Sequence, residues 1–319
     1  MKRMLIKVVP FVFLLTITYQ SVQNPYTTSF VEGLKADTMT VSKQKDALYM
    51  DIQAKAKQYE IKPQDARVDK VWKLVPGYNG LKVDVDASYK SMKKDGVFTE
   101  DKLIYKQVKP NVHLSDLPAQ PIYRGHEDKP MVSFIINVAW GNEYIPSMLD
   151  TLKKHHVKAT FFLEGRWVKN NPDMTKVILD AGHELGNHSY SHPDMARLTN
   201  DRSREELVNT NDVMKSVTGK ENKWFAPPSG SYRQETVEIA SELNMRTIMW
   251  SVDTIDWQKP QPDVLIQRVM KKVHPGAIIL MHPTDSTAKS LDRLIQNIKD
   301  EQLEISDLTT LLDEERMIK

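Results

Sequence analysis

MVSFIINVAWGNEYIPSMLDTLKKHHVKATFFLE, residues 131–164, decides the fold of this 319-residue chain. The stretch opens with an apolar run, Met131 to Val138, continues with apolar residues at helical spacing from Ile145 to His155, and ends in a second apolar run, Ala159 to Glu164. Two short apolar runs separated by an amphipathic helix predict a β-α-β unit. Because such a crossover joins parallel strands, we expect a parallel sheet with a helix packed against it.

The same alternation of strand and helix continues to the end of the chain. Further strands are predicted at His183 to His188, Trp224 to Pro227, Arg246 to Asp253, Ala277 to His282 and Leu303 to Ile305. Further helices are predicted at Pro172 to Ala181, Arg204 to Thr218, Gln234 to Leu243, Gln261 to Val273 and Ala288 to Glu301. A series of β-α units in one domain favours a barrel over an open sheet, and barrel chemistry sits at the C-terminal ends of the strands. His188, Asp253 and His282 fall at such ends.

The part of the chain before residue 126 has a different pattern. A polar, Thr/Ser/Gln-rich segment leads to a small α/β subdomain, and nothing in that subdomain has the spacing of a catalytic site. Its predicted elements are a helix at Tyr49 to Tyr59, strands at Val71 to Val75 and Leu81 to Val85, a helix at Ala87 to Lys93 and a strand at Leu103 to Val108. We therefore expect a signal peptide or membrane anchor at 1–22, a linker and small subdomain at 23–125, and the barrel at 126–319.

Charge, cysteine content and the N-terminus limit the class of protein. The 44 Lys and Arg against 42 Asp and Glu give a formal charge of +2, so no basic surface indicates nucleic acid as a partner. There is no cysteine, so a metal would need His, Asp or Glu as ligands. Basic residues precede the apolar run Val8 to Tyr19, which is typical of a secretory signal. The pattern predicts export. Two alternatives stay open for the N-terminal segment: a signal that is cleaved, or a retained anchor that contacts the membrane. The sequence does not determine the oligomeric state.

His188 and His192 are the first candidate metal ligands. Two imidazoles four residues apart can meet on one ion if the backbone between them turns helically. A catalytic zinc normally takes three protein ligands and a water, so these two do not complete a site.

Five ordered segments resemble the polysaccharide deacetylases of carbohydrate esterase family four, which carry the NodB homology domain. The matching segments are Val157 to Phe162, Gly182 to Pro193, Phe225 to Tyr232, Asp253 to Trp257 and Leu280 to His282. The Trp140-Gly141 pair is most similar to the branch found in endospore-forming bacteria, which implies a role in sporulation. The resemblance implies a distorted (β/α) barrel, a divalent metal that is usually zinc, and an N-acetylated cell-envelope glycan such as peptidoglycan as substrate.

The resemblance also assigns roles to single positions. His188 and His192 match metal ligands, His282 the catalytic acid, and Leu280 the apolar wall beside the acetyl methyl group. Asp256 matches a carboxylate that the family pairs with an arginine, and here Ala226 replaces that arginine. Further matches are the aromatic residues Tyr232, Trp140 and Trp257 of the substrate groove. The motif of the first strand differs most from the family pattern, because Asn137 occupies the position of the catalytic base and Val138 the position of the third metal ligand.

These departures affect the expected chemistry. Hydrolysis of an acetamide needs a metal-activated water, a base and an acid. Asn137 is a neutral amide and cannot act as the base, an omission that costs ~10²- to 10⁴-fold in rate. Val138 has no lone pair, so metal affinity should be weak or lost unless Glu143 or Asp194 supplies a carboxylate. Both acids also suit a helix terminus or a loop.

Two classes of function therefore remain open, and the sequence leaves uncertain whether the chain is an enzyme. The first is a deacetylase homologue with lost or strongly reduced catalysis that acts as a glycan-binding or scaffolding protein. The second is an active metal-dependent N-deacetylase with a substitute base and ligand. Action on another amide or ester is a third possibility. We favour the first, because base, third ligand and arginine are all absent.

Overall fold

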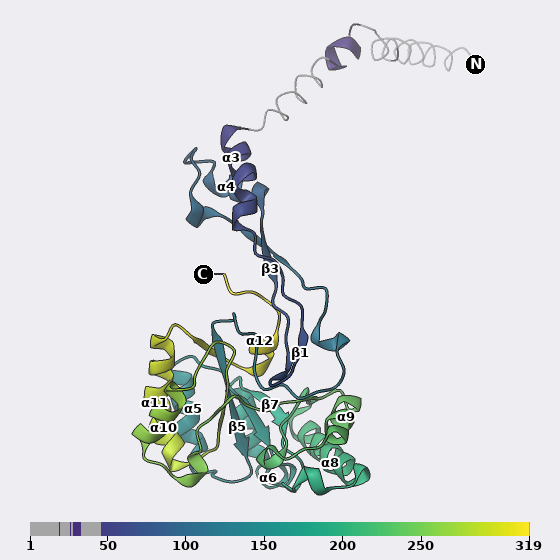
Figure 1. The fold of residues 1–319 in the computed structure, drawn as a ribbon, viewed down its shortest axis with the longest axis vertical. Helices are drawn as coiled ribbons and strands as arrows, with labels where there is room; N and C mark the ends of the chain where they lie inside the picture. Colours follow the sequence, from purple (N-terminus) through teal and green to yellow (C-terminus); the bar gives the residue numbers. More distant parts are fainter. Residues whose placement is uncertain (1–18, 20–25, 27, 33–45, 319) are drawn as a thin grey trace, which may run out of the picture. The chain divides into compact units, whose positions relative to one another are not determined.

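The computed structural model describes residues 19, 26, 28–32 and 46–318 (Figure 1). They form two compact units, one made of the residues up to Tyr59 with Val83–Lys106, and one made of Glu60–Lys82 with the residues from Gln107 onward. This division differs from the predicted single boundary at 125/126. Backbone bonds explain the difference: Leu74 N donates to Pro121 O at 3.1 Å, and Ile122 N donates to Thr247 O at 2.9 Å. Segments before residue 126 are thus tied to the barrel.

The predicted signal peptide or anchor at 1–22 lies outside the described residues, apart from Tyr19. None of the helices in the described part of the chain is long and apolar enough to cross a membrane.

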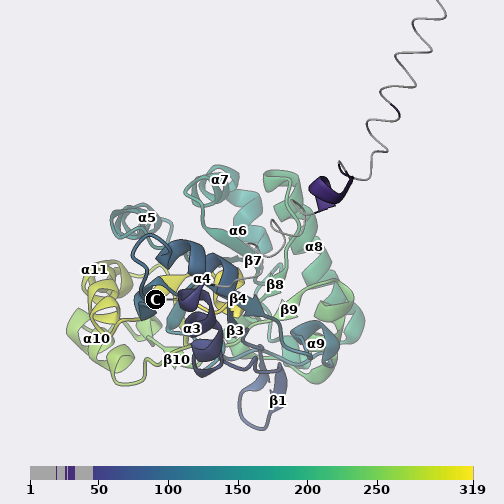
Figure 2. The same ribbon diagram turned by 90° about the horizontal axis from the view of Figure 1, so that it is seen from above.

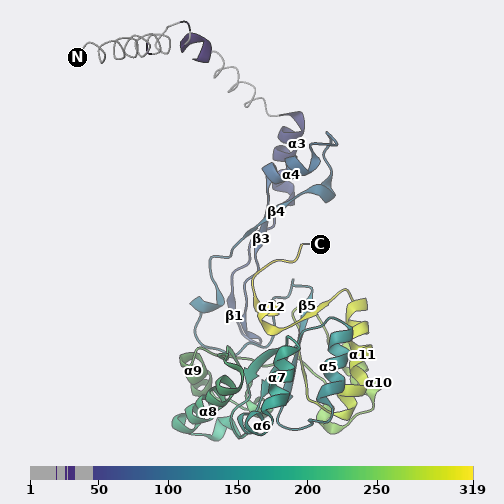
Figure 3. The ribbon, with the colours of Figure 1, turned by 180° about the vertical axis from the view of Figure 1, so that it is seen from behind.

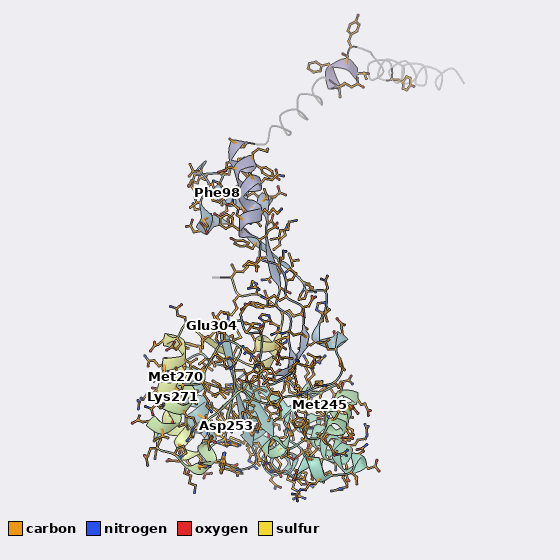
Figure 4. The ribbon with its side chains drawn as sticks, viewed as in Figure 1. Phe98, Met245, Asp253, Met270, Lys271 and Glu304 are labelled. Atoms are coloured by element: carbon orange, nitrogen blue, oxygen red, sulfur yellow. The ribbon has the colours of Figure 1, made fainter. Side chains whose placement is uncertain are left out.

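The smaller unit is built around helices α3 (Ala47–Lys55) and α4 (Val85–Met92), close to their predicted positions. Asp46 and Asp84 cap the two helices by accepting bonds from Leu48 N and Ala87 N. Apolar side chains from both helices form its core, and the ring of Phe98, labelled in Figure 4, lies 4.2 Å from the Lys55 ammonium. It also contains the 3-10 turns Ala56–Tyr59 and Glu100–Lys102.

Two small sheets lie before the barrel in sequence. β1 (Arg67–Asp69) pairs antiparallel with β2 (Lys73–Val75) in the larger unit. β3 (Gly80–Val83) pairs with β4 (Tyr105–Val108), and three of these four strands were predicted. β1 was not predicted, because its three residues are too short for an apolar alternation to show.

The barrel is a curled, eight-stranded parallel sheet in the order β10-β11-β5-β6-β7-β8-β9, with β12 paired to β5. The strands are β5 (Met131–Val138), β6 (Thr160–Leu163), β7 (Glu184–Asn187), β8 (Trp224–Phe225), β9 (Arg246–Thr247), β10 (Val252–Asp253), β11 (Ile278–Met281) and β12 (Glu304–Ser306). This confirms the predicted (β/α) barrel fold and the position of its first strand.

One predicted strand, Arg246 to Asp253, is wrong as a continuous element. It divides into β9 and β10, which lie at the two opposite ends of the strand order. The physical reason is a competing segment: Met249 N donates to Ile122 O at 2.7 Å, so the backbone after Thr247 bonds to residue 122 and not along one continuous ladder. The barrel is distorted at this place.

Helices surround the sheet, as Figures 2 and 3 show. They are α5 (Ile145–Lys154), α6 (Gly165–Asn170), α7 (Pro172–Asp180), α8 (Asn200–Thr218), α9 (Gln234–Glu242), α10 (Pro262–Met270), α11 (Asp285–Asp300) and α12 (Leu308–Leu312). All the predicted helices are present. α6 and α12 were not predicted, because they are too short to show a helical period.

Alternate residues of β5 face two separate cores. Phe134, Ile136 and Val138 pack in the cluster that the sheet shares with α5 and α11, whereas Ile135 packs with Phe162 in the cluster inside the curled sheet. Successive side chains of a strand point to opposite faces, so Asn137 belongs to the inner side. This alternation decides which residues can line a site at the end of β5.

His183, at the start of β7, gives the fold a dependence on pH. Its ring is buried, its Nδ1 accepts from Ala159 N at 3.2 Å, and burial lowers its pKa to about 4. Unfolded histidine titrates near ~6.5, so the unfolded chain takes up the proton first. We expect the free energy of unfolding to fall as the pH drops from about 6.5 to about 4. Urea titrations should show a flatter decline for His183→Asn, which keeps an acceptor, than for the exposed control His156→Asn.

Candidate functional site

A cavity of about 510 Å³ lies at the C-terminal ends of the barrel strands. It gathers most of the predicted site residues, which come from the C-terminal ends of four strands, β5, β7, β10 and β11, and from the loops after them. Its lining is Asn137, Ala139, Trp140, His188, His192, Ser229, Trp250, Asp253, Trp257, Leu280 and His282. Asp253 is labelled in Figure 4 and lies within the larger unit. Position at the C-terminal ends of the strands is typical of barrel active sites.

The two imidazoles after β7 face each other in this cavity. His188 is buried and its Nδ1 lies 2.8 Å from Ala226 O, so Nδ1–H donates to this carbonyl and leaves Nε2 free. The His188 and His192 ring centroids are 5.1 Å apart with planes at 72°. Burial above all, together with the neighbouring imidazoles of His192 and His282, lowers the pKa of His188 to about 3, so this ring is neutral at pH 7.

The backbone between the two histidines is a bent loop, so the rings meet without the helical turn that their spacing would otherwise need. Ser189 and His192 have φ of 61° and 57°, in the left-handed region that L-residues other than glycine rarely adopt. Ser189 Oγ accepts from His192 N at 3.1 Å, and Asn187 Oδ1 accepts from Ser189 N at 2.8 Å. Local side chains thus offset a strained conformation that brings the rings together.

Glu206 on α8 holds this loop, and it was not among the residues predicted from the sequence. Its buried carboxylate accepts from Tyr190 N at 2.9 Å, from Ser191 N at 2.7 Å and from Ser191 Oγ at 2.7 Å. The spacing in the sequence could have indicated this residue. Glu206 follows Ser203 by three residues and precedes Thr210 by four, and all three lie on the buried face of the helix. An acid on a buried helix face indicates a specific partner.

Asn137 and Val138 lie on opposite sides of β5. Asn137 lines the cavity, is 4% exposed, and its Oδ1 has no hydrogen-bond partner among the described residues. Val138 is fully buried in the apolar cluster behind the sheet and does not line the cavity. The position matched to the base therefore faces the site, and the position matched to the third metal ligand packs among apolar side chains.

His282 and Asp256 form a pair at the opposite wall. His282 Nδ1 lies 2.8 Å from Asp256 Oδ1, while His282 N and Thr287 Oγ1 both donate to Asp256 Oδ2 at 2.6 Å. Asp256 is completely buried. Ala226 deprives Asp256 of the arginine that the family pairs with this carboxylate, and His282 is its partner in this structure. The carboxylate fixes His282 with Nδ1–H inward and Nε2 available to the cavity.

The other predicted residues lie elsewhere. Tyr232 is not in the cavity lining, and its hydroxyl bonds to Tyr123 Oη at 2.9 Å. Asp194 bonds to Ser231 Oγ and pairs with Arg197 at 3.0 Å. Glu143 borders a second, separate cavity.

Neither proposed substitute acid joins the histidine pair. Among residues 46–318 and the few described before them, no group of three or more His, Cys, Asp or Glu is placed to hold a metal ion. The donor set of His188 and His192, with apolar Val138 at the third position, does not fit a catalytic zinc, which needs three protein ligands.

The curled barrel, the histidine loop and the His282–Asp256 pair define a deacetylase-type site. The family model for polysaccharide deacetylase matches residues 124–248, and a crystal structure of BA3943, a CE4 family pseudoenzyme from Bacillus anthracis, is 57% identical with a TM-score of 0.81 over 86% of this chain and 97% of that one. The chain belongs to the polysaccharide deacetylase family, carbohydrate esterase family four.

Two curated relatives from Bacillus subtilis extend the comparison. The uncharacterised protein YlxY is 55% identical over 97% of both chains. The peptidoglycan-N-acetylmuramic acid deacetylase PdaA is 32% identical over 61% of this chain and 76% of that protein. A mutant of the B. anthracis pseudoenzyme, 56% identical with a TM-score of 0.81 over 85% of this chain and 99% of that one, has restored enzymatic activity.

Proposed function

We propose that this chain binds an N-acetylated glycan of the cell envelope, peptidoglycan in particular, and does not deacetylate it at a useful rate. One observation carries the proposal: the cavity keeps its glycan-facing walls while Asn137 stands at the position of the base. An amide cannot accept the proton of an attacking water near pH 7. The chain would then serve as a glycan-binding or scaffolding protein.

The walls that remain suit a sugar. Trp140 and Trp257 are 48% and 57% exposed at the cavity mouth, where their faces can stack on the apolar side of a pyranose ring. Leu280 offers an apolar surface for an acetyl methyl group, and His282 a hydrogen-bonding nitrogen. The similarity to PdaA, named for action on peptidoglycan N-acetylmuramic acid, supports the same glycan here.

Weak or absent zinc binding forms part of the proposal. Deacetylases of this family depend on a divalent metal, and His188 and His192 would be the ligands this chain still offers. Val138 lies in an apolar cluster and supplies no lone pair. The restored activity of the pseudoenzyme mutant supports the same interpretation, since that related barrel needed substitutions to become active.

The place of action is also a proposal. The basic residues before the apolar run Val8 to Tyr19 support export, either as a secreted protein or anchored in the membrane by that segment. The Trp140-Gly141 similarity to deacetylases of endospore formers supports a role in sporulation.

The test measures binding and hydrolysis on the same sample. The purified chain should sediment with insoluble peptidoglycan, and it should release no acetate from peptidoglycan or chitooligosaccharides with zinc or cobalt present. Trp257→Ala should lower the bound fraction about tenfold, since an aromatic stacking surface is lost. If the wild type releases acetate and His192→Ala abolishes that release, the chain is instead an active deacetylase. Its third metal ligand would then be a residue other than Glu143 or Asp194.

A further inference from the structure

The hairpin of β1 and β2 carries apolar side chains that the fold leaves exposed. Val68 and Val71 are 48% and 69% exposed. The turn lies at the periphery of the larger unit, where Figure 2 shows the loop beside β1. Single exposed valines are ordinary on a protein surface, so the neighbours of these two decide whether they have a role.

The structure holds the hairpin at its base and at its turn. Leu74 is fully buried and packs with Ile122 in the cluster inside the curled sheet. In the turn, Asp69 Oδ1 accepts from Val71 N at 2.7 Å and from Trp72 N at 2.8 Å. The exposed side chain of Val71 is therefore presented on an ordered backbone, which lowers the entropy cost of binding a partner.

Trp72 connects the hairpin to the edge of the sheet where the parallel strands begin. The Arg124 guanidinium lies 5.6 Å from the centre of the Trp72 ring, and the ring of His274 lies 6.3 Å from it. Arg124 Nη2 also donates to Pro275 O at 2.8 Å. Because His274 and Pro275 precede β11, this contact lies at the N-terminal ends of the strands, opposite to the candidate site.

Basic residues accompany the exposed valines. Lys70 and Lys73 belong to the turn, and Lys70 is exposed. Lys271, labelled in Figure 4, and Lys272 are exposed in the segment that leads from α10 to His274. Within the described part of the chain, none of these four lysines forms an ion pair. The surface thus combines unpaired positive charge with exposed apolar side chains.

A membrane that contains anionic lipids matches this combination. Lysine and arginine are attracted to anionic headgroups, and apolar and aromatic side chains enter the interface beneath them. Asp69, the acid of the hairpin, is occupied by its two backbone bonds. We propose that the hairpin binds the surface of such a membrane, with Val68 and Val71 in the interface and the lysines at the headgroups.

This inference does not depend on the proposed glycan binding, and it adds an orientation to it. The candidate cavity lies at the C-terminal ends of the strands, whereas the hairpin packs where the strands begin. A chain bound through the hairpin would keep its candidate site open on the side away from the membrane.

A fluorescent label on the full-length chain tests the proposal. The chain contains no cysteine, so Val71→Cys can carry a single environment-sensitive fluorophore. Its fluorescence should rise with vesicles of phosphatidylcholine and phosphatidylglycerol in equal amounts, and not with phosphatidylcholine alone. Val177→Cys on α7 is the matched control, because Val177 is also 51% exposed and also follows an exposed lysine. A label there should not respond, and membrane attachment by another part of the chain should leave both labels unchanged.

The charge requirement is tested in the chain labelled at position 71. Lys70→Gln should raise the lipid concentration at half-maximal signal about fivefold, because one basic residue near an anionic surface is lost. Lys176→Gln, which makes the same change beside Val177, should have no effect. No rise at position 71, an equal rise at position 177, or an equal rise with neutral vesicles overturns the proposal. The same rise with soluble polyphosphate would also overturn it, and would indicate an anionic polymer as the partner.

Discussion

Asn137→Asp, Val138→Asp and Ala226→Arg together are expected to give the chain zinc-dependent acetate release from chitooligosaccharides. A carboxylate at position 137 would face the cavity, where Asn137 now has an unpartnered Oδ1. General base catalysis contributes ~10²- to 10⁴-fold, so the gain over the wild type should be of that order. Acetate release and bound zinc per chain, measured on the same preparations, check the prediction.

The three substitutions differ in structural cost. Val138 is buried among apolar side chains, so an aspartate there must turn toward the cavity or remain as a buried charge, at a cost of several kcal/mol. Ala226 lies inside the curled sheet, so an arginine there needs both space and the new carboxylate as a partner. We expect Ala226→Arg alone to destabilise the fold more than it does together with Asn137→Asp.

A fourth change provides the control. Adding His192→Ala to the triple variant should return acetate release to the wild-type level, because one of the ligands is removed again. A folded triple variant that takes up no zinc would contradict the assignment of Val138 to the ligand position.

The strands of the barrel could be predicted because each is short, apolar and bounded by a helix of clear period. Met131 to Val138 was predicted without error, and the neighbouring strands to within about two residues at each end. The division of Arg246 to Asp253 could not be predicted, because it depends on backbone bonds to Ile122, more than a hundred residues earlier. The local pattern of apolar residues contains no information on pairing between backbone segments that are so far apart in sequence.

The same distinction applies to the site. The motifs placed Asn137, His188, His192 and His282 at one cavity, since each lies at the end of a parallel strand or in the loop after it, and these strand ends meet at one edge. The pairing of Asp256 with His282 spans 26 residues and follows from the loop geometry after β10. A sequence motif indicates where a residue lies in the fold, but it does not indicate which residue it will contact.

Glu206→Ala is expected to destabilise the fold strongly. Ser189 and His192 keep positive φ angles that cost on the order of 1–2 kcal/mol each, and the Glu206 carboxylate offsets this cost through three hydrogen bonds to Tyr190 and Ser191. Without it, the N–H groups of the half-buried residues Tyr190 and Ser191 lose their acceptor, so we expect a loss of about 3 kcal/mol in the free energy of unfolding. Glu206→Gln keeps one acceptor oxygen and should lose about half as much.

Urea unfolding measures the change, and glycan binding reports its effect on the site. Glu205→Ala is the matched control, since Glu205 is the adjacent residue of α8, is exposed and, among the residues that the structure describes, pairs only with Arg202. The loss for Glu205→Ala should be about 0.5 kcal/mol. Glu206→Ala should also weaken glycan binding, because the loop that carries His192 relaxes out of the cavity wall. A loss for Glu206→Ala as small as that for Glu205→Ala would mean that the loop keeps its shape unaided, and that the strained backbone at Ser189 and His192 is held by the bonds from Asn187 and Ser189 alone.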